Sequence, residues 1–174
     1  SAPAERSRLP TQVCWLHALV QERLRYAPLG WAHAYKFSDA DLRKSPATLD
    51  TAVDAVAQGR ANLAPDRLPW MTLLTLFSQC IYGGKIDNHF DQTLLDCMLQ
   101  QIFTSKSFEP EHKLIVRYDG GTQGRVPDAS RCDVLLDWAE KIHSAQLPSW
   151  LGPTTPRRCC CSRDSTSSSE TCLR

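Results

Sequence analysis

The sequence predicts a mainly α-helical bundle with a small β-tending appendage towards its C-terminal end, and three observations support this prediction. Apolar residues recur at helical spacing on both sides of a short glycine turn between residues 69 and 103. The same period recurs near residues 12–25 and 39–58, and again after Asp128. The β-prone stretch 114–118 has no convincing partner strand.

Composition restricts the classes of function. The chain has 174 residues, 42% of them hydrophobic, which suits one domain or one domain plus part of another. Its 20 basic and 19 acidic residues balance, so charge gives no case for a nucleic-acid or anionic-membrane partner. No apolar run approaches the ~20 residues of a spanning helix, and we expect no membrane insertion. The polar N-terminus carries no visible signal peptide, and the missing initiating Met suggests a fragment.

The first helix is expected over about residues 12–25, capped by Thr11, after a lead-in of residues 1–10 cut from a preceding module. Its inward face is expected to hold Val13, Leu16, Val20 and Leu24. Arg23 and Arg25 crowd its end. Two interpretations stay open for these cations: a solvated helix end favoured by the helix dipole, or a contact with another module.

The loop 26–31 is expected to be pinned to the core. Pro28 stops the preceding helix, Gly30 permits a sharp bend, and Trp31 is expected to pack rather than to bind a ligand.

The second helix is expected to open near Asp39, because Ser38 and Asp41 resemble a capping box. We expect a break or kink at Pro46 and an end at Gly59.

The stretch 69–103 is expected to be a helical hairpin around which the other helices assemble. Its first apolar face holds Trp70, Leu73, Leu74, Phe77, Cys80 and Ile81, and its second holds Phe90, Leu94, Cys97, Met98 and Ile102. Between them Tyr82, Gly83 and Gly84 form a turn in which glycine is expected to supply a left-handed residue. Asn88 is expected to cap the second helix, with Asp91 in its first turn.

The C-terminal third changes character. After the β-prone stretch 114–118, Asp128 is expected to open a last helix whose inward residues are Cys132, Leu135, Leu136, Ala139 and Ile142. Residues 153–174 are rich in Ser, Thr, Cys and Arg without an apolar period, and we expect a disordered, divergent tail. The eight cysteines are expected to be reduced, because four lie on or beside apolar stripes and no secretory signal is visible.

No catalytic, cofactor or metal site is expected in the chain. Gly83-Gly84-Lys85 is similar to the end of a P-loop, but the motif needs an earlier glycine at Gln79 and a Ser or Thr at Ile86. The five histidines are scattered, without HExxH or paired CxxC spacing. The sequence shows no serine or cysteine nucleophile paired with a histidine.

Several separate motifs resemble dynein heavy chains, close to the end of the motor ring. They are QERLRYAPLGW at 21–31, KFSDADLR at 36–43, GRANLAPDRLPW at 59–70, IYGGKIDNHFDQTLLD at 81–96 and PSWLG at 148–152. Their order and spacing agree with those of dynein heavy chains over roughly residues 6–152. The sequences of the motifs resemble the cytoplasmic transport form more than axonemal forms. The tail departs from this pattern, which would continue into a long C-terminal domain.

The resemblance implies a helical AAA+ lid over residues 11–104, the lid of the last ring module, and the start of the dynein C-terminal region over residues 105–152. It implies an ATP-driven, minus-end-directed microtubule motor, with ATP and Mg bound in other modules and none here. The implied partners are neighbouring AAA+ modules, the dynein light, intermediate and light intermediate chains, and the microtubule. The implied location is the cytoplasm, associated with microtubules.

The residues expected to matter structurally or between modules, by position in these motifs, are Tyr82, Gly83, Gly84, Lys85, Asp91, Arg23, Arg25 and Trp31. The alternative function is a stand-alone helical protein-interaction module or adaptor. A free adaptor would expose a binding groove or patch and fold alone, whereas a severed lid would expose large apolar faces and aggregate.

Overall fold

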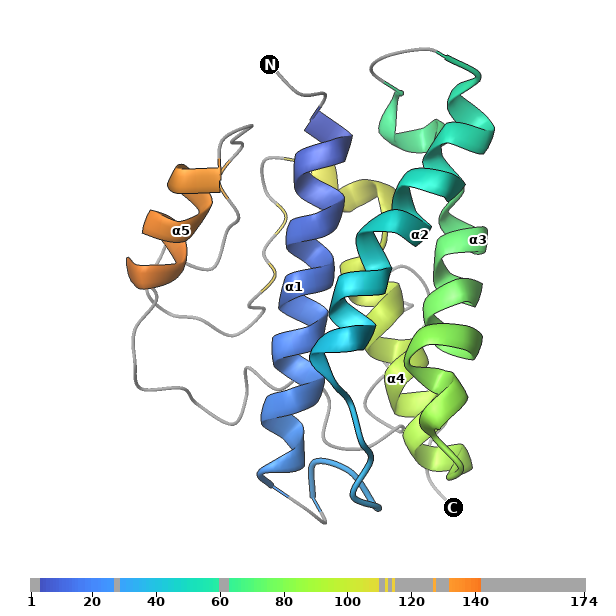
Figure 1. Cartoon of the computed structure of the whole chain (residues 1–174), viewed down its shortest axis with the longest axis vertical. Coiled ribbons are helices and arrows are strands. Elements are labelled where there is room, and N and C mark those ends of the chain that lie inside the picture. The colour runs from blue at the N-terminus through green and yellow to red at the C-terminus, as the bar shows by residue number, and fades with distance from the viewer. Residues whose placement is uncertain are drawn as a thin grey trace, which may run out of the picture.

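The computed structural model describes residues 4–26, 29–59, 63–109 and 132–141, together with residues 112, 114 and 127. The helices are α1 (Ala4–Leu24), α2 (Asp39–Ala57), α3 (Trp70–Thr75), α4 (His89–Ile102) and α5 (Cys132–Lys141). A π-helical segment, η2 (Leu76–Ile81), continues α3, and the described residues also form the 3-10 turns η1 (Pro65–Arg67), η3 (Gly83–Lys85) and η4 (Ser105–Phe108). The first four α-helices alternate in direction along one long axis, as Figure 1 shows, so the predicted helical bundle is confirmed.

Helix α1 begins earlier than predicted. Residues 4–10 belong to the helix rather than to a lead-in, and Pro10 lies inside it. Thr11 does not cap the helix, because its Oγ1 donates to the carbonyl of Ser7, one turn earlier, at 2.9 Å. The predicted face is largely correct, with Val13, Leu16 and Val20 buried.

Helix α2 opens at Ser38 as predicted, and Asp41 accepts the Ser38 backbone N–H at 2.8 Å. It then runs through Pro46 as one helix, so the predicted break is wrong, whereas the alternative of a kink there stays a prediction. An interior proline costs a helix about 3 kcal/mol, which the buried apolar face of α2 offsets. The helix ends as expected, although Gln58 (φ 47°) takes the left-handed conformation together with Gly59 (φ 80°).

The predicted hairpin is confirmed in α3, η2 and α4, and Asn88 caps α4 by accepting the backbone N–H of Phe90 at 2.8 Å. Its apolar faces differ in detail. Cys80 and Phe90 are exposed, whereas the prediction placed both inward, and the prediction missed buried Leu95 and Leu99. Cys80 lies in η2, where the wider π turn shifts each side chain away from the α-helical period.

The core lies between the first four helices and is closed at one end by residues 30–37. Its buried aromatic residues are Trp31, Tyr35, Phe37, Phe77, Tyr82 and Phe103. Phe77 stacks on Phe103 with ring centroids 5.0 Å apart, which ties η2 to the end of α4. Beyond α4, Phe108 in η4 meets Trp70 edge-on, so this turn also packs on the bundle.

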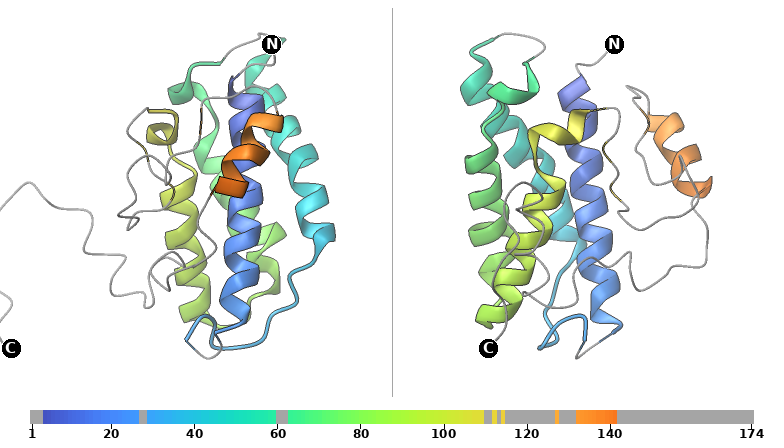
Figure 2. Two further views of the ribbon diagram at one scale, coloured as in Figure 1. Left: turned by 90° about the vertical axis from the view of Figure 1, so that its left-hand side faces the viewer. Right: turned by 180° about the vertical axis from the view of Figure 1, so that it is seen from behind.

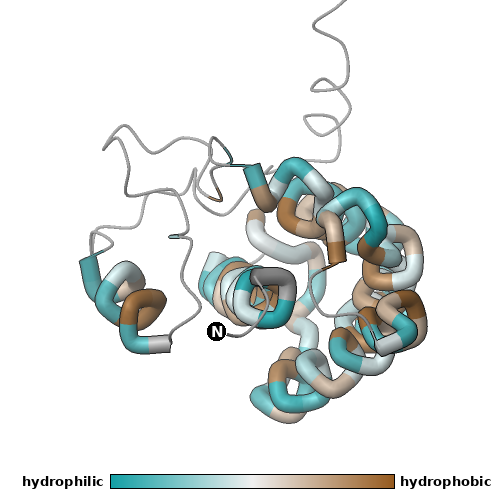
Figure 3. The backbone as a smooth tube through the Cα atoms, turned by 90° about the horizontal axis from the view of Figure 1, so that it is seen from above, coloured by the Kyte–Doolittle hydropathy of each residue, from teal (hydrophilic) through white to brown (hydrophobic). Residues whose placement is uncertain are grey.

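Helix α5 confirms the predicted last helix and lies on the outer side of α1, away from the other helices, in Figures 1, 2 and 3. Leu136 (60% exposed) and Ala139 are exposed, so the predicted inward face is wrong at these positions. The predicted strand at 114–118 and the tail 153–174 fall outside the described residues, except for residue 114. The domain divisions at 104/105 and 152/153 stay predictions.

The cysteines differ from the expectation. Cys14 and Cys80 are exposed rather than buried on an apolar stripe. Cys97 is disulfide-bonded, which contradicts the prediction that all eight thiols are reduced. Within the described part of the chain, no helix has the length and hydropathy to cross a membrane.

Candidate functional site

The end of α1 is locked to the loop that follows it. Gly30 donates its N–H to the carbonyl of Tyr26 at 2.8 Å, and a Cβ on Gly30 would lie 1.9 Å from the Arg23 carbonyl oxygen. Only glycine allows this close approach. The Arg23 guanidinium donates twice to the Gly30 carbonyl, at 3.0 and 2.8 Å, and lies 5.5 Å from the Trp31 ring centroid. Arg23 is therefore an internal brace, not a solvated helix end.

Asp91 ties the same loop to α4. It is 4% exposed and accepts the Ala32 N–H at 2.9 Å and the Tyr35 hydroxyl at 2.7 Å. Burial lowers the pKa of Arg23 to about 10, and the nearby Asp91 charge opposes that shift. Arg23 therefore stays protonated at neutral pH and compensates the buried carboxylate. Arg23, Trp31, Tyr35 and Asp91 form what we call the Asp91 cluster.

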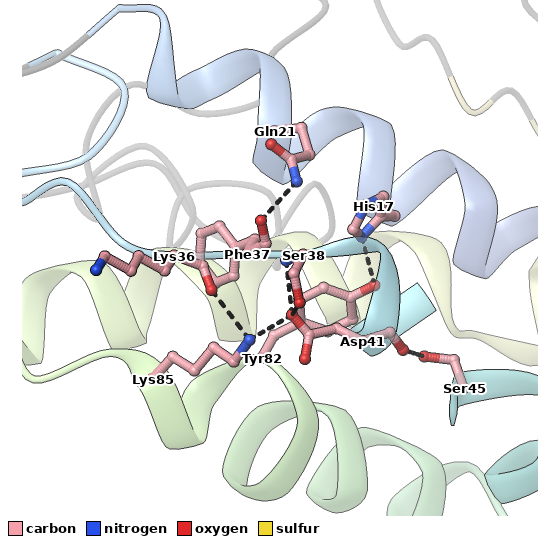
Figure 4. Close-up of polar contacts among 9 residues, drawn as sticks. All are labelled: His17, Gln21, Lys36, Phe37, Ser38, Asp41, Ser45, Tyr82 and Lys85. Carbon is pink, nitrogen blue, oxygen red and sulfur yellow. Dashed lines mark hydrogen bonds and ion pairs between the residues drawn. The ribbon is translucent and has the colours of Figure 1, made fainter. Parts of the chain in front are cut away.

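Lys85 ties the glycine turn to the start of α2. Its Nζ donates to the Lys36 carbonyl at 3.0 Å and forms an ion pair with Asp41 (Figure 4). Asp41 also accepts the Ser38 N–H. Burial alone would raise the pKa of Asp41, but the bonds from Lys85 and Ser38 outweigh it and hold that pKa below its ordinary value.

Tyr82 and His17 connect this turn to α1. The Tyr82 hydroxyl lies 3.1 Å from His17 Nδ1, and both side chains are buried. Burial lowers the pKa of His17, although Asp39 and Asp41 oppose the shift, and burial raises the pKa of Tyr82. His17, Asp41, Tyr82 and Lys85 form the Lys85 cluster, whose side chains converge from α1, α2 and the turn in Figure 4.

The π turn determines which atoms Tyr82 and the following glycines face. The Tyr82 N–H bonds to the Phe77 carbonyl, five residues earlier, at 3.1 Å. A Cβ on Gly83 would lie 1.5 Å from the Ser78 carbonyl oxygen, which also accepts Gln92 Nε2 at 2.8 Å. The expected left-handed glycine is therefore wrong here, because Gly83 is needed for close packing and Gly59 is the described glycine with positive φ.

The structure separates the eight predicted residues. Arg23, Trp31 and Asp91 meet in one cluster, Tyr82 and Lys85 meet in the other, and Gly83 packs on Ser78. Gly84 and Arg25 are exposed and join neither cluster. Arg25 pairs with Glu22 at 3.1 Å, one turn away on the same helix end.

Sequence reasoning missed three members of the clusters. The sequence predicts Asp41 only as a capping residue, and His17 and Tyr35 carry no motif signal. The one available signal for Asp41 is the pattern KFSDADLR, because this pattern contains Asp41 and is one of the motifs that resemble dynein heavy chains.

The two clusters connect helices and leave their charged groups engaged with the protein. Lys85, the P-loop-like lysine, lies in a 3-10 turn between helices and is bonded to Lys36 and Asp41. Among the described residues, no three His, Cys, Asp or Glu side chains gather in a way that could hold a metal ion.

Comparison with known proteins places this geometry in context. A family model described as the dynein heavy chain AAA lid domain matches residues 6–155. Similar relatives carry the name "Dynein heavy chain, cytoplasmic": one from Caenorhabditis elegans is 65% identical over 151 residues, and one from Drosophila melanogaster is 51% identical over 154 residues. These matches cover 87% and 86% of this chain and 3% of each relative. The chain thus spans a small part of the length of the curated relatives that it matches.

Proposed function

The chain belongs to the dynein heavy chain AAA lid family, and on this premise we propose that it is a non-catalytic lid that couples rearrangement of a motor ring to neighbouring modules. The parent is proposed to be an ATP-driven, minus-end-directed microtubule motor. ATP and Mg bind in its other modules. The lid moves as one rigid body, so that a displacement at its contact with one neighbouring module reaches its contact with another.

The observation that carries this proposal is the pair of clusters at one end of the bundle. Lys85 connects the glycine turn to α2, and Asp91 connects α4 to the loop after α1. The carboxylates of Asp41 and Asp91 are buried, and removing a donor from a buried carboxylate leaves its charge less compensated, so these contacts fix the relative orientation of the elements that they join. A bundle tied in this way resists internal shear, which supports rigid transmission.

The proposed partners follow from the family. They are the neighbouring AAA+ modules of the same heavy chain, the light, intermediate and light intermediate chains of the complex, and the microtubule. The proposed location is the cytoplasm, in association with microtubules. The names of the relatives, cytoplasmic dynein heavy chains, support that location.

The test replaces Lys85 with methionine in the full heavy chain. Met keeps the aliphatic length and removes the ammonium group that binds Asp41 and the Lys36 carbonyl. Basal ATP turnover should stay within about twofold, while its stimulation by microtubules should fall about fivefold or more, the range of an ordinary allosteric coupling energy. Arg25→Met is the matched control, because Arg25 is an exposed cation outside both clusters, and it should change neither rate.

Two results would refute the proposal. Unchanged stimulation by microtubules in Lys85→Met would show that the contact of Lys85 with Asp41 and the Lys36 carbonyl does not contribute to coupling between modules. Loss of basal turnover in that variant, with the heavy chain still folded, would place the residue in the catalytic machinery.

Exposed apolar side chains fit one other function, a stand-alone interaction module, as well as they fit a lid separated from its neighbours. Leu29, Met71 and Phe90 are 78%, 75% and 68% exposed. Peptides from residues 86–106 followed by mass spectrometry across a denaturing size separation distinguish the two. Recovery only from a polypeptide far larger than 19.5 kDa supports the lid, and recovery near 19.5 kDa supports the module.

A further inference from the structure

A groove of about 690 Å³ opens between the α3–η2 helix and α4. Leu99 and Phe103, both buried, lie beneath it, and Met71, 75% exposed, lines its edge. Its volume falls in the range of pockets that hold small molecules, roughly 300–1,000 Å³, so it has room for a few side chains of a partner. Neither the Asp91 cluster nor the Lys85 cluster lines it.

Asp96 is the one charged residue that lines the groove in the described part of the chain. Its Oδ1 accepts the Ser78 hydroxyl at 2.5 Å and Gln92 Nε2 at 3.2 Å. Gln92 is itself held by the Ser78 carbonyl at 2.8 Å. These bonds orient the carboxylate through Oδ1, and the described residues place neither a hydrogen bond on Oδ2 nor an ion pair on Asp96. The groove therefore presents an oriented negative charge beside an apolar floor.

We propose that this groove docks another segment of the same heavy chain, one that places an apolar side chain over Leu99 and Phe103 and pairs a lysine or arginine with Asp96. Charge complementarity supports the basic side chain, because a fixed carboxylate at the edge of a groove selects a cation. Exposed Met71 supports an apolar contact, since its flexible thioether adapts to the shape of a partner.

The source of the segment follows from the size of the parent. The chain makes up 3% of the heavy chains that it matches, so most of the polypeptide lies outside these residues. A segment of the same chain meets the groove at a high effective concentration, which a separate protein lacks. The inference rests on membership of a heavy chain and not on the coupling role proposed for the two clusters.

The experiment places a photo-crosslinking amino acid, p-benzoylphenylalanine, at Met71 in the full heavy chain. After irradiation, mass spectrometry should identify a crosslink to one peptide of the same heavy chain that contains a lysine or arginine. The product should keep the size of a single heavy chain. The same amino acid at Val56, 42% exposed on α2 and outside the groove, is the matched control and should not reach that peptide.

The charge is tested by Asp96→Asn, which keeps Oδ1 as an acceptor for Ser78 and Gln92. Crosslinking from position 71 should fall about threefold to tenfold, as expected for loss of one ion pair at a partly desolvated site. A crosslink to a different polypeptide, no crosslink, or an unchanged yield in Asp96→Asn would each overturn the proposal. Failure of the coupling role would appear separately, as normal microtubule stimulation in Lys85→Met.

Discussion

Replacing Gly83 with alanine tests whether the turn after the π segment depends on close packing. A Cβ at this position would lie 1.5 Å from the carbonyl oxygen of Ser78, 2.5 Å from its carbonyl carbon and 2.9 Å from Gln92 Nε2. Cβ contacts shorter than 3.0 Å essentially do not occur, so the backbone of the turn must move away from η2. That movement acts on Tyr82 and Lys85, which flank the glycines and belong to the Lys85 cluster.

The expected cost combines three effects. Forcing a methyl group into a packed site costs about 1 to 3 kcal/mol, and loss of the bond from Gln92 to the Ser78 carbonyl adds about 1 kcal/mol. The smaller entropy of the unfolded alanine chain returns about 0.4 to 1 kcal/mol. The free energy of unfolding should therefore fall by about 1 to 3.5 kcal/mol, compared with a typical total of about 5 to 15 kcal/mol.

The assay is urea unfolding of the 174-residue chain, followed by circular dichroism. Gly84→Ala is the matched control, because its added Cβ would meet only the Gln79 carbonyl oxygen at 3.1 Å, and Gly84 is exposed. The control should change the free energy of unfolding by less than about 1 kcal/mol in either direction. Equal effects of the two substitutions, or a loss below about 0.5 kcal/mol for Gly83→Ala, would refute the packing argument.

Three further predictions concern the ties between helices. Asp91→Ala should lower the free energy of unfolding by about 3 kcal/mol or more in urea titrations, because it strands the Ala32 N–H and leaves Arg23 without its nearby anion. Gly30→Ala should cost about 2 to 4 kcal/mol in the same assay, since the new Cβ would lie 1.9 Å from the Arg23 carbonyl; a variant as stable as the parent would contradict that contact. Burial lowers the pKa of His17 below 6.5, so its contribution is complete above that pH and is lost as the pH falls through the folded-state pKa. The free energy of unfolding should therefore decline from about pH 7 towards pH 5, and His17→Gln should flatten that decline.

The hairpin and its caps were predictable from sequence because local chemistry determines them. Asn88 at the start of α4 and the Ser38–Asp41 pair at the start of α2 act over three residues, so no tertiary information is needed. The buried faces at Leu73 and Phe77 follow from the helical period in the same way.

The errors in the hairpin arise where the period itself changes. In the π segment the Tyr82 N–H bonds to the carbonyl of Phe77, five residues earlier instead of four, so each turn holds one more residue than an α-helical turn. A prediction that assumes the α-helical period therefore places Cys80 inward, whereas Cys80 is exposed. Nothing in the letters LFSQCI marks that change. The same limit explains the error about Gly83, because a glycine required by a carbonyl five residues earlier looks like a glycine required by its own φ.

The two clusters were only half predictable. Lys85 and Asp91 stand in a recognisable motif, but their partners lie far away in sequence, at Asp41 and at Ala32. Position in a motif identified the residues as important without showing what they contact. Arg25, predicted with equal weight to Arg23, faces solvent because it lies two residues after Arg23 and beyond the end of α1 at Leu24, so it does not share the inward direction of Arg23.

The most direct test of the central claim measures whether the lid stays rigid while the motor works. Spin labels carried by non-natural amino acids at Thr51 on α2 and Gln101 on α4, both exposed, would report the distance between the two helices in the full heavy chain. A rigid lid should give one narrow distance distribution that is the same with ATP, with ADP and without nucleotide. A shift of more than about 2 Å between those states would show that the lid deforms internally, and would contradict transmission by a braced body.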